Sequence, residues 1–143
     1  MKKQLQQLWD FQSVYDQTRN TKPTLINPTE SMLRYELGKE ELIEYLEACN
    51  NDDLVEVTDA LADQLYILLG TMVAHGMQGI IKDVFNEVHR SNMSKLGEDG
   101  KPIYREDGKV LKGPNYSPPN IGKFLYTDTQ MELPFNAWFN EDV

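Results

Sequence analysis

Acidic residues recur at helical spacing in two stretches of this sequence, each time beside the residues of an apolar core. Segment 40–47 reads EELIEYLE, and segment 56–70 reads EVTDALADQLYILLG. Side chains three or four positions apart lie on one face of a helix, so each segment presents a column of carboxylates. If the two helices pack antiparallel, the columns face each other. The acids concerned are Glu40, Glu41, Glu44, Glu47, Glu56, Asp59 and Asp63.

The chemistry that such columns favour is binding of a hard cation. Neither helix has a basic residue in the same stripe to neutralise the carboxylates, and a carboxylate removed from water without a partner is costly. Ligand sets made only of oxygen suit Mg²⁺ or Mn²⁺, which keep several waters and reach toward substrate phosphates. The pattern therefore predicts a metal site for phosphate chemistry.

A simpler interpretation competes for part of the set. Glutamates on a helix usually form a solvated face, and this fits segment 40–47, above all Glu40 and Glu47. It fits Asp59 and Asp63 poorly, because aspartate is unfavourable inside a helix and both residues lead into an apolar run. For this pair we expect a metal-binding or catalytic role.

A fourth helix adds an amide and an ammonium group. Its apolar stripe, Ile81, Phe85 and Val88, continues to Asn92 and Lys95, so these two are expected to face inward. Lysine binds phosphate as a point charge, and asparagine can bridge phosphate or sugar oxygens. Alternatively, Lys95 only complements the helix dipole in the last turn. Both interpretations remain open.

Four helices are needed to position these groups, and the apolar spacing predicts them at 3–17, 29–49, 54–74 and 80–96. Thr29 or Ser31 is expected to cap the second helix, and Asp52 or Asp53 the third. The third helix should end at His75-Gly76 and should be central, because its second half is apolar nearly all round.

From Gly97 onward the composition changes to glycine, proline and charged residues. Short extended pieces around Ile103 and Val110 predict a small hairpin, and segment 124–143 is an irregular aromatic arm. The prediction is an all-α fold, an antiparallel bundle of four to five helices with an irregular or small-hairpin extension. Residues 1–97 are expected to form the helical catalytic domain, and residues 98–143 an extension of it.

Composition limits the partners and the compartment. The chain has 143 residues, 40% of them hydrophobic, a net charge of -9 and a pI of about 4.6. This suits one domain and argues against binding to a nucleic-acid backbone. The single cysteine excludes an intrachain disulfide. The N-terminus lacks the apolar core of a signal peptide, and the apolar run around Leu65 to Leu69 is too short to span a bilayer. We expect a cytoplasmic protein without nucleic-acid or membrane partners.

The motifs as a whole resemble those of a known superfamily. EELIE followed by EVTD is similar to the signature of the all-α NTP pyrophosphohydrolases, which include MazG-like proteins and phosphoribosyl-ATP pyrophosphohydrolase. EVHRSNMSKLGEDGKPIYREDGKVLKGPNYSPPNI resembles a bacterial and phage branch of this group. LWDFQSVYD resembles it too, with Gln12 where a histidine is expected. The signature positions here are Glu40, Glu41, Glu44, Glu56 and Asp59, and Asp63 before the Leu-Tyr pair is also characteristic.

The resemblance implies an Mg²⁺-dependent enzyme (Mn²⁺ is the alternative ion) that cleaves a nucleoside triphosphate between the α and β phosphates, giving a monophosphate and pyrophosphate. Nucleotide-pool house-cleaning is one such role. Members are homo-oligomers, often dimers or tetramers, whose sites are completed by a neighbouring subunit. The ligands are then expected among Glu41, Glu44, Glu56, Asp59 and Asp63.

The remaining roles follow from the same hypothesis. Glu40 and Glu41 are the candidate catalytic residues, with Glu40 as a base on the attacking water. Substrate phosphate or sugar is expected at Asn92, Lys95, Lys112 and Asn115. Trp9, Phe11 and Tyr15 either stack on the base or belong to the core, and core packing is favoured for at least two of them.

Two alternatives remain. The first is a helical module that binds nucleotide or a partner protein without hydrolysis. The second is a hydrolase for modified or damaged nucleotides. Carboxylates at interior positions favour an enzyme, because a pure interaction module does not need them.

Overall fold

The structure, a computed structural model, describes residues 1–125 of the chain, so most of the predicted aromatic arm lies outside the described residues. Within 1–125 there are five helices and no strand, which confirms the all-α class. The helices are α1 (Lys2–Val14), α2 (Pro28–Asn50), α3 (Leu54–Ala74), α4 (Ile81–Met93) and α5 (Gly122–Leu125).

The start of α2 is set by an asparagine and a proline. The Asn27 side chain accepts a hydrogen bond from the backbone N–H of Glu30 at 2.9 Å, and Pro28 occupies the first turn, where its missing N–H costs nothing. The predicted cap at Thr29 or Ser31 is therefore wrong. The Ser31 hydroxyl instead donates to the Pro28 carbonyl at 2.9 Å inside the helix.

Both ends of α3 agree with the sequence prediction. The Asp53 carboxylate accepts from the backbone N–H groups of Val55 at 3.0 Å and Glu56 at 3.1 Å. At the other end Gly76 has a φ of 72°, a conformation that glycine adopts without strain. A Cβ at Gly76 would lie 2.0 Å from the carbonyl oxygen of Lys22, so the loop before α2 can cross this helix end only at a glycine.

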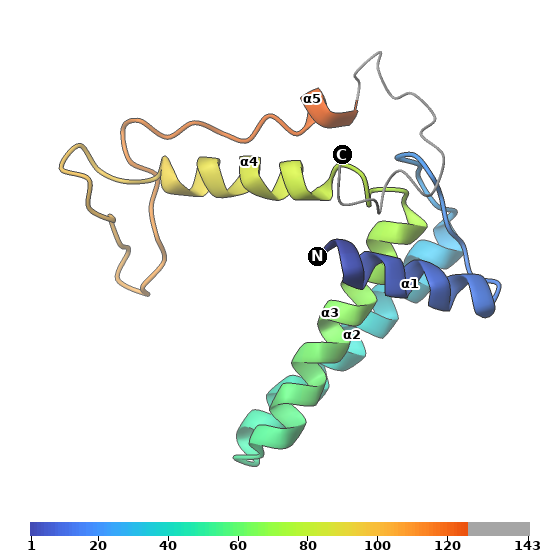
Figure 1. Ribbon diagram of the computed structural model, residues 1–143. Helices are drawn as coiled ribbons and strands as arrows, with labels where there is room; N and C mark the ends of the chain where they lie inside the picture. The colour runs from blue at the N-terminus through green and yellow to red at the C-terminus, as the bar shows by residue number, and fades with distance from the viewer. Residues whose placement is uncertain (126–143) are drawn as a thin grey trace. The chain divides into compact units, whose positions relative to one another are not determined.

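The chain divides into two compact units, one of residues 1–79 and one beginning at Ile80. In the first unit α2 and α3 form a long antiparallel hairpin, and α1 crosses it near the start of α2 and the end of α3 (Figure 1). Helix α3 packs against both α1 and α2, which confirms its central place in this unit. The buried apolar residues are Leu5, Leu8, Ala48, Ala60, Leu69, Val73 and Ala74.

The hairpin nevertheless leaves a large apolar surface uncovered. Leu65 is 53% exposed and Leu68 52%, although both lie in the apolar half of α3. Leu42 and Leu46 of α2 are each 59% exposed. By length and composition alone, α3 is also the one helix of the described chain long and apolar enough to cross a membrane. Core helices of soluble proteins pass the same test.

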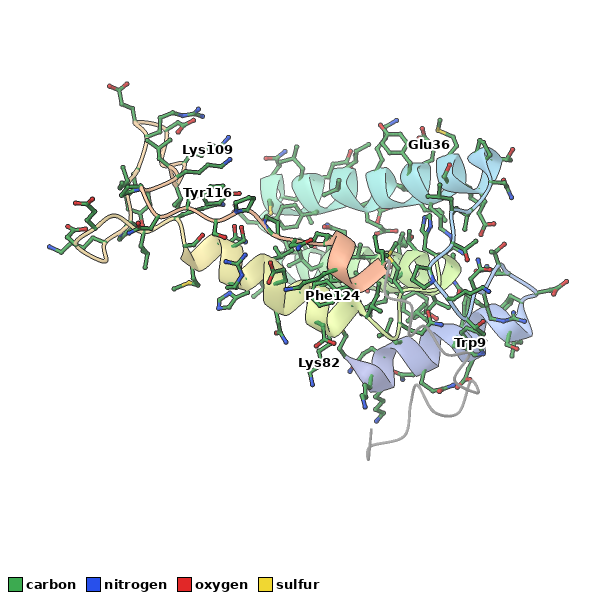
Figure 2. All side chains as sticks on the ribbon, turned by 90° about the horizontal axis from the view of Figure 1, so that it is seen from above. Trp9, Glu36, Lys82, Lys109, Tyr116 and Phe124 are labelled. Carbon is green, nitrogen blue, oxygen red and sulfur yellow. The ribbon has the colours of Figure 1, made fainter. Side chains whose placement is uncertain are left out.

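In the second unit the chain leaves α4, forms an irregular excursion and runs back along the helix (Figure 1). Figure 2 shows Lys109 and Tyr116 on this excursion and Lys82 on α4. The predicted hairpin is present only as one antiparallel bridge between Tyr104 and Val110, without regular strands. The expected division at residues 97 and 98 stays a prediction.

The predicted inward stripe of α4 is wrong. Phe85 is 61% exposed and Val88 38% exposed, whereas Glu87 and Ser91 are buried. The physical reason is the returning segment 117–123, which covers the polar face of the helix. Glu87 accepts hydrogen bonds from the Asn120 backbone N–H at 2.9 Å, from Lys123 Nζ at 3.0 Å and from both ends of the Arg90 guanidinium.

Candidate active site

Glu41 lies at the centre of the acidic cluster in the first unit. The pKa of its carboxyl is raised, first by burial and then by the neighbouring charges of Glu44, Asp63, Glu40 and Asp59. Two of these charges come from α2 and two from α3, so the predicted columns do face each other across the hairpin. The structure thus brings these five acids within electrostatic reach of one another.

One oxygen of Glu41 lacks any partner. Its Oε2 atom is buried and accepts no hydrogen bond. Among residues 1–125, the ion pairs that the structure shows involve other acids, such as Glu30, Glu36 and Glu87. A buried carboxylate oxygen without a donor is costly, and a bound cation would satisfy it.

A hydrogen bond between the helices sets the register of the cluster. Gln64 Nε2 on α3 donates to the backbone carbonyl of Glu41 on α2 at 3.3 Å. Asp63 directly precedes Gln64, so this bond holds its backbone beside that of Glu41. The register does not depend on the charged side chains themselves.

The acidic cluster is not a preformed metal-binding site. In the described part of the chain, no three Asp, Glu, His or Cys side chains are close enough together to hold a metal ion. Five like charges repel each other, the ion pairs seen within residues 1–125 do not include them, and Glu40, Glu44, Asp59 and Asp63 are all exposed. Glu56 does not act on the Glu41 carboxyl, so its place among the ligands stays a prediction.

The donor set fits a hard divalent cation. The acids offer oxygen only, the central carboxylate has a buried oxygen without a donor, and both helices hold their backbones rigidly. Mg²⁺ uses one or a few carboxylates together with waters and substrate phosphates, so it does not need three ligands already in place.

The predicted substrate residues gather separately, at the end of α4 in the second unit. Lys95 Nζ donates to Asn92 Oδ1 at 2.7 Å, and the Lys95 carbonyl accepts from the backbone N–H of Gly113 at 2.9 Å. The KGPNY segment is thereby fastened to the helix end. Lys112 lies with its Nζ 4.3 Å from the ring centre of Tyr116, and Asn115 is exposed.

Gly113 explains how the segment comes so close. A Cβ at this position would lie 2.1 Å from the carbonyl oxygen of Leu96, a distance that no side chain tolerates. The backbone contact with the helix end therefore requires glycine. Lys95 and Lys112 therefore lie on two segments whose backbones are joined by a hydrogen bond.

The sequence prediction gave no role to two polar residues of the first unit, the buried Gln12 and the half-buried Arg34. Gln12 was noted only for replacing a histidine, and Arg34 was not noted. A usable signal existed, because Arg34 stands seven positions before Glu41 and so shares its helix face. Gln12 and Arg34 both line a cleft between α1 and the hairpin.

Comparison with known proteins identifies the class and then the family. The described helices place the chain among all-α proteins. The sequence profile of the PRA-PH family, phosphoribosyl-ATP pyrophosphohydrolase, matches residues 8–92, which is more than half of the chain. The chain belongs to this family, and the resemblance seen in the motifs is confirmed.

One solved structure is also similar. It comes from Exiguobacterium sp. 255-15, is described as a "putative NTP pyrophosphohydrolase", and is 35% identical with a TM-score of 0.44. The match covers 66% of this chain, and this chain spans 60% of that protein's length. No curated protein matches the sequence.

Proposed function

We propose that this protein is an Mg²⁺-dependent nucleoside triphosphate pyrophosphohydrolase, with Mn²⁺ as a second usable ion. It cleaves between the α and β phosphates and releases a monophosphate and pyrophosphate. The observation that carries the proposal is the buried Glu41 oxygen without a hydrogen-bond donor, surrounded by four like charges. Membership of a pyrophosphohydrolase family supports the reaction type.

In this proposal the acids of the hairpin hold the ion and activate water. The ligands are Glu41, Glu44, Glu56, Asp59 and Asp63. When bound, Mg²⁺ supplies charge neutralisation of the triphosphate and orients its oxygens. Glu40 is exposed next to Glu41, so its carboxylate can reach a solvent water and accept its proton, while Glu41 orients the same water.

The basic group of the second unit holds the rest of the substrate. Lys95 and Asn92 are joined by a hydrogen bond and offer an ammonium and an amide to phosphate or sugar oxygens. Lys112 and Asn115, which flank the tightly packed Gly113, are the other two substrate-binding residues of the proposal. In-line attack on a phosphate needs such positioned positive charge more than it needs covalent chemistry.

A homodimer or a dimer of dimers is part of the proposal. A hollow of about 740 Å³ on the hairpin is lined in part by apolar residues, among them Leu42, Leu65 and Leu68. Exposed apolar patches of this kind mark protein interfaces. A second copy of the chain fits this face, because a hairpin with one apolar side completes a bundle by pairing with its own copy.

The test is release of pyrophosphate from a panel of NTPs and dNTPs with Mg²⁺, with EDTA as the blank. Asp63→Asn removes one charge from the cluster and should abolish turnover while keeping the fold. Glu36→Gln is the matched control, since Glu36 is an exposed acid on the outer side of α2 (Figure 2) that pairs with Lys39. Equal activity in wild type and Asp63→Asn would place the site elsewhere.

A further inference from the structure

Glu87 is the one acid of residues 1–125 that is buried as a whole residue, with 7% of it exposed. Each of its two carboxylate oxygens accepts two hydrogen bonds. Oε1 accepts from Arg90 Nη2 and from the Asn120 backbone N–H, both at 2.9 Å, and Oε2 accepts from Arg90 Nε and from Lys123 Nζ, both at 3.0 Å. A carboxylate has about four acceptor positions, so Glu87 has none left for a metal ion, a water or a substrate.

Two further side chains of α4 tie the returning segment to the same face of the helix. Arg90 Nη2 also donates to the Pro118 carbonyl at 3.1 Å, and Ser94 Oγ accepts from the Ser117 backbone N–H at 2.9 Å. The segment therefore runs from the last turn of α4 back toward Glu87 (Figure 1), and Glu87 holds its far end.

The near end of this segment is the turn that follows Lys112. The Gly113 N–H donates to the Lys95 carbonyl at 2.9 Å, and the Gly113 carbonyl accepts from the Tyr116 N–H at 3.1 Å, which closes a turn over residues 113–116. The ring centre of Tyr116 lies 4.3 Å from Lys112 Nζ, a distance at which a ring face attracts an ammonium group. Since Ser117 follows Tyr116 directly, a segment fixed from Ser117 onward also fixes the ring that holds Lys112.

Two pairs of cations on α4 and on the segment differ in their partners. Arg90 and Lys123 both form ion pairs with Glu87. Lys95 and Lys112 do not occur in the ion pairs seen within residues 1–125, and they contact a neutral amide and a neutral ring instead. The second pair therefore keeps its positive charge for a phosphate, whereas the first pair is used to hold the segment.

We propose that Glu87 is a positioning residue for substrate binding, which holds the returning segment on α4 and thereby sets the place of the Lys112 ammonium group. The inference rests on the proposed function and adds to it a residue that does not touch the nucleotide. Glu87 lies six residues before Met93, the last residue of α4, which is roughly 9 Å along the helix axis. Its effect on a phosphate at Lys112 passes through the segment.

Glu87→Gln separates positioning from simple charge attraction. The variant removes a negative charge and frees Arg90 and Lys123, so Coulomb attraction alone would strengthen the binding of a polyanion. Positioning predicts the opposite result, because the amide nitrogen of glutamine cannot accept a hydrogen bond and the segment is held less firmly. In calorimetric titrations of the full chain with inorganic tripolyphosphate and Mg²⁺, the Kd should rise about tenfold.

A double-mutant cycle shows whether Glu87 acts through Lys112. Lys112→Met should weaken tripolyphosphate binding by itself, and Glu87→Gln added to Lys112→Met should change the Kd by less than about twofold. A residue needed only for folding would weaken binding by the same factor in both backgrounds. With NTP as substrate, Glu87→Gln should raise KM about tenfold and leave kcat within about twofold, as expected when only binding is lost.

Asp83→Asn is the matched control, because it removes one negative charge from an exposed position of the same helix and should leave the Kd unchanged. Circular dichroism reports on the fold of each variant. If Glu87→Gln does not fold, Glu87→Asp takes its place, since it keeps the charge on a side chain one methylene group shorter. Its loss of affinity should be smaller and should likewise vanish in the Lys112→Met background.

Unchanged or tighter tripolyphosphate binding in the folded Glu87 variant overturns the inference. An equal loss in Asp83→Asn, an equal factor in both backgrounds of the cycle, or unchanged binding in Lys112→Met does so too. Pyrophosphate release from NTPs by the wild type would in each of these cases leave the proposed function intact.

Discussion

Gln64 on α3 donates a hydrogen bond to the backbone carbonyl of Glu41 on α2 across 3.3 Å. This contact holds Asp63 beside Glu41 although their charges repel each other. The acidic cluster is therefore maintained by neutral contacts and helix packing, at a cost in electrostatic energy. Sites that bind cations tightly commonly carry such a cost in the absence of the ion.

Glu41→Gln should stabilise the protein when divalent cations are removed. The pKa of Glu41 is raised, so its ionised form is disfavoured in the fold and lowers stability above that pKa. Neutralising it should raise the Tm by roughly 2–4 °C for each kcal/mol regained. Differential scanning calorimetry in EDTA at pH 7 measures the change.

The same variant should lose its response to Mg²⁺. Wild-type protein at a Mg²⁺ concentration of about 100 times the Kd gains roughly 2.7 kcal/mol from binding. Glu41→Gln should show little of this gain, and Glu36→Gln should keep it. An equal Mg²⁺-induced rise in Tm for all three proteins would mean that Glu41 does not hold the ion.

The hydrogen bonds that tie segment 117–123 to Glu87 should be lost at low pH. Contacts with Arg90, the Asn120 N–H and Lys123 hold the pKa of Glu87 far below its ordinary value of 4.5. A lowered folded pKa stabilises the fold above 4.5, and this contribution is lost progressively as the pH falls toward the folded pKa. The protection factor of the Asn120 amide, which is its exchange rate relative to that of an unstructured peptide at the same pH, should therefore fall over that range in the wild type. In Glu87→Gln this protection factor should already be low at pH 7 and should change less with pH.

Gly113→Ala should release the KGPNY segment from α4. Its Cβ would overlap the Leu96 carbonyl oxygen at 2.1 Å, and overpacking of this kind costs about 1–3 kcal/mol. We expect a higher KM for nucleotide with nearly unchanged Mg²⁺ binding. Gly100→Asn is the control, because Gly100 has open space around it and asparagine tolerates a positive φ. An equal rise in KM in both variants would contradict the claim that close packing at Gly113 supports nucleotide binding.

Leu68→Glu should dissociate the proposed oligomer. Leu68 is 52% exposed and lines the apolar hollow of the hairpin, where a buried charge without a partner is unfavourable. Light scattering after size exclusion should show a monomer. Leu25→Glu is the control, since Leu25 is 91% exposed and lies outside the hollow. A wild-type protein that is already monomeric would contradict the prediction.

The sequence predicted most helices because their signals are local. The cap at Asp53, the glycine at the end of α3 and the spacing within each acid column all depend on residues within a few positions of each other. The face that α4 buries depends instead on Asn120 and Lys123, which lie 33 and 36 residues from Glu87. No periodicity within α4 can show that a polar segment returns to cover it.

The cleft at Gln12 could not be predicted from the sequence for the same reason. Its partner Gly70 lies 58 residues away, and a single glutamine in an amphipathic helix carries no signal of its own. Arg34 could have been found from its spacing to Glu41. The hydrogen-bonding capacity left over in the cleft, however, is visible only once the three helices are packed.

The most direct test of the central claim is the identity of the products, followed by phosphorus NMR during incubation of the full chain with NTPs and Mg²⁺. The proposed function predicts a nucleoside monophosphate and pyrophosphate in equal amounts, and no reaction in EDTA. A nucleoside diphosphate with orthophosphate would contradict the proposed cleavage position. No turnover of any nucleotide, together with no Mg²⁺ binding, would contradict the enzyme itself.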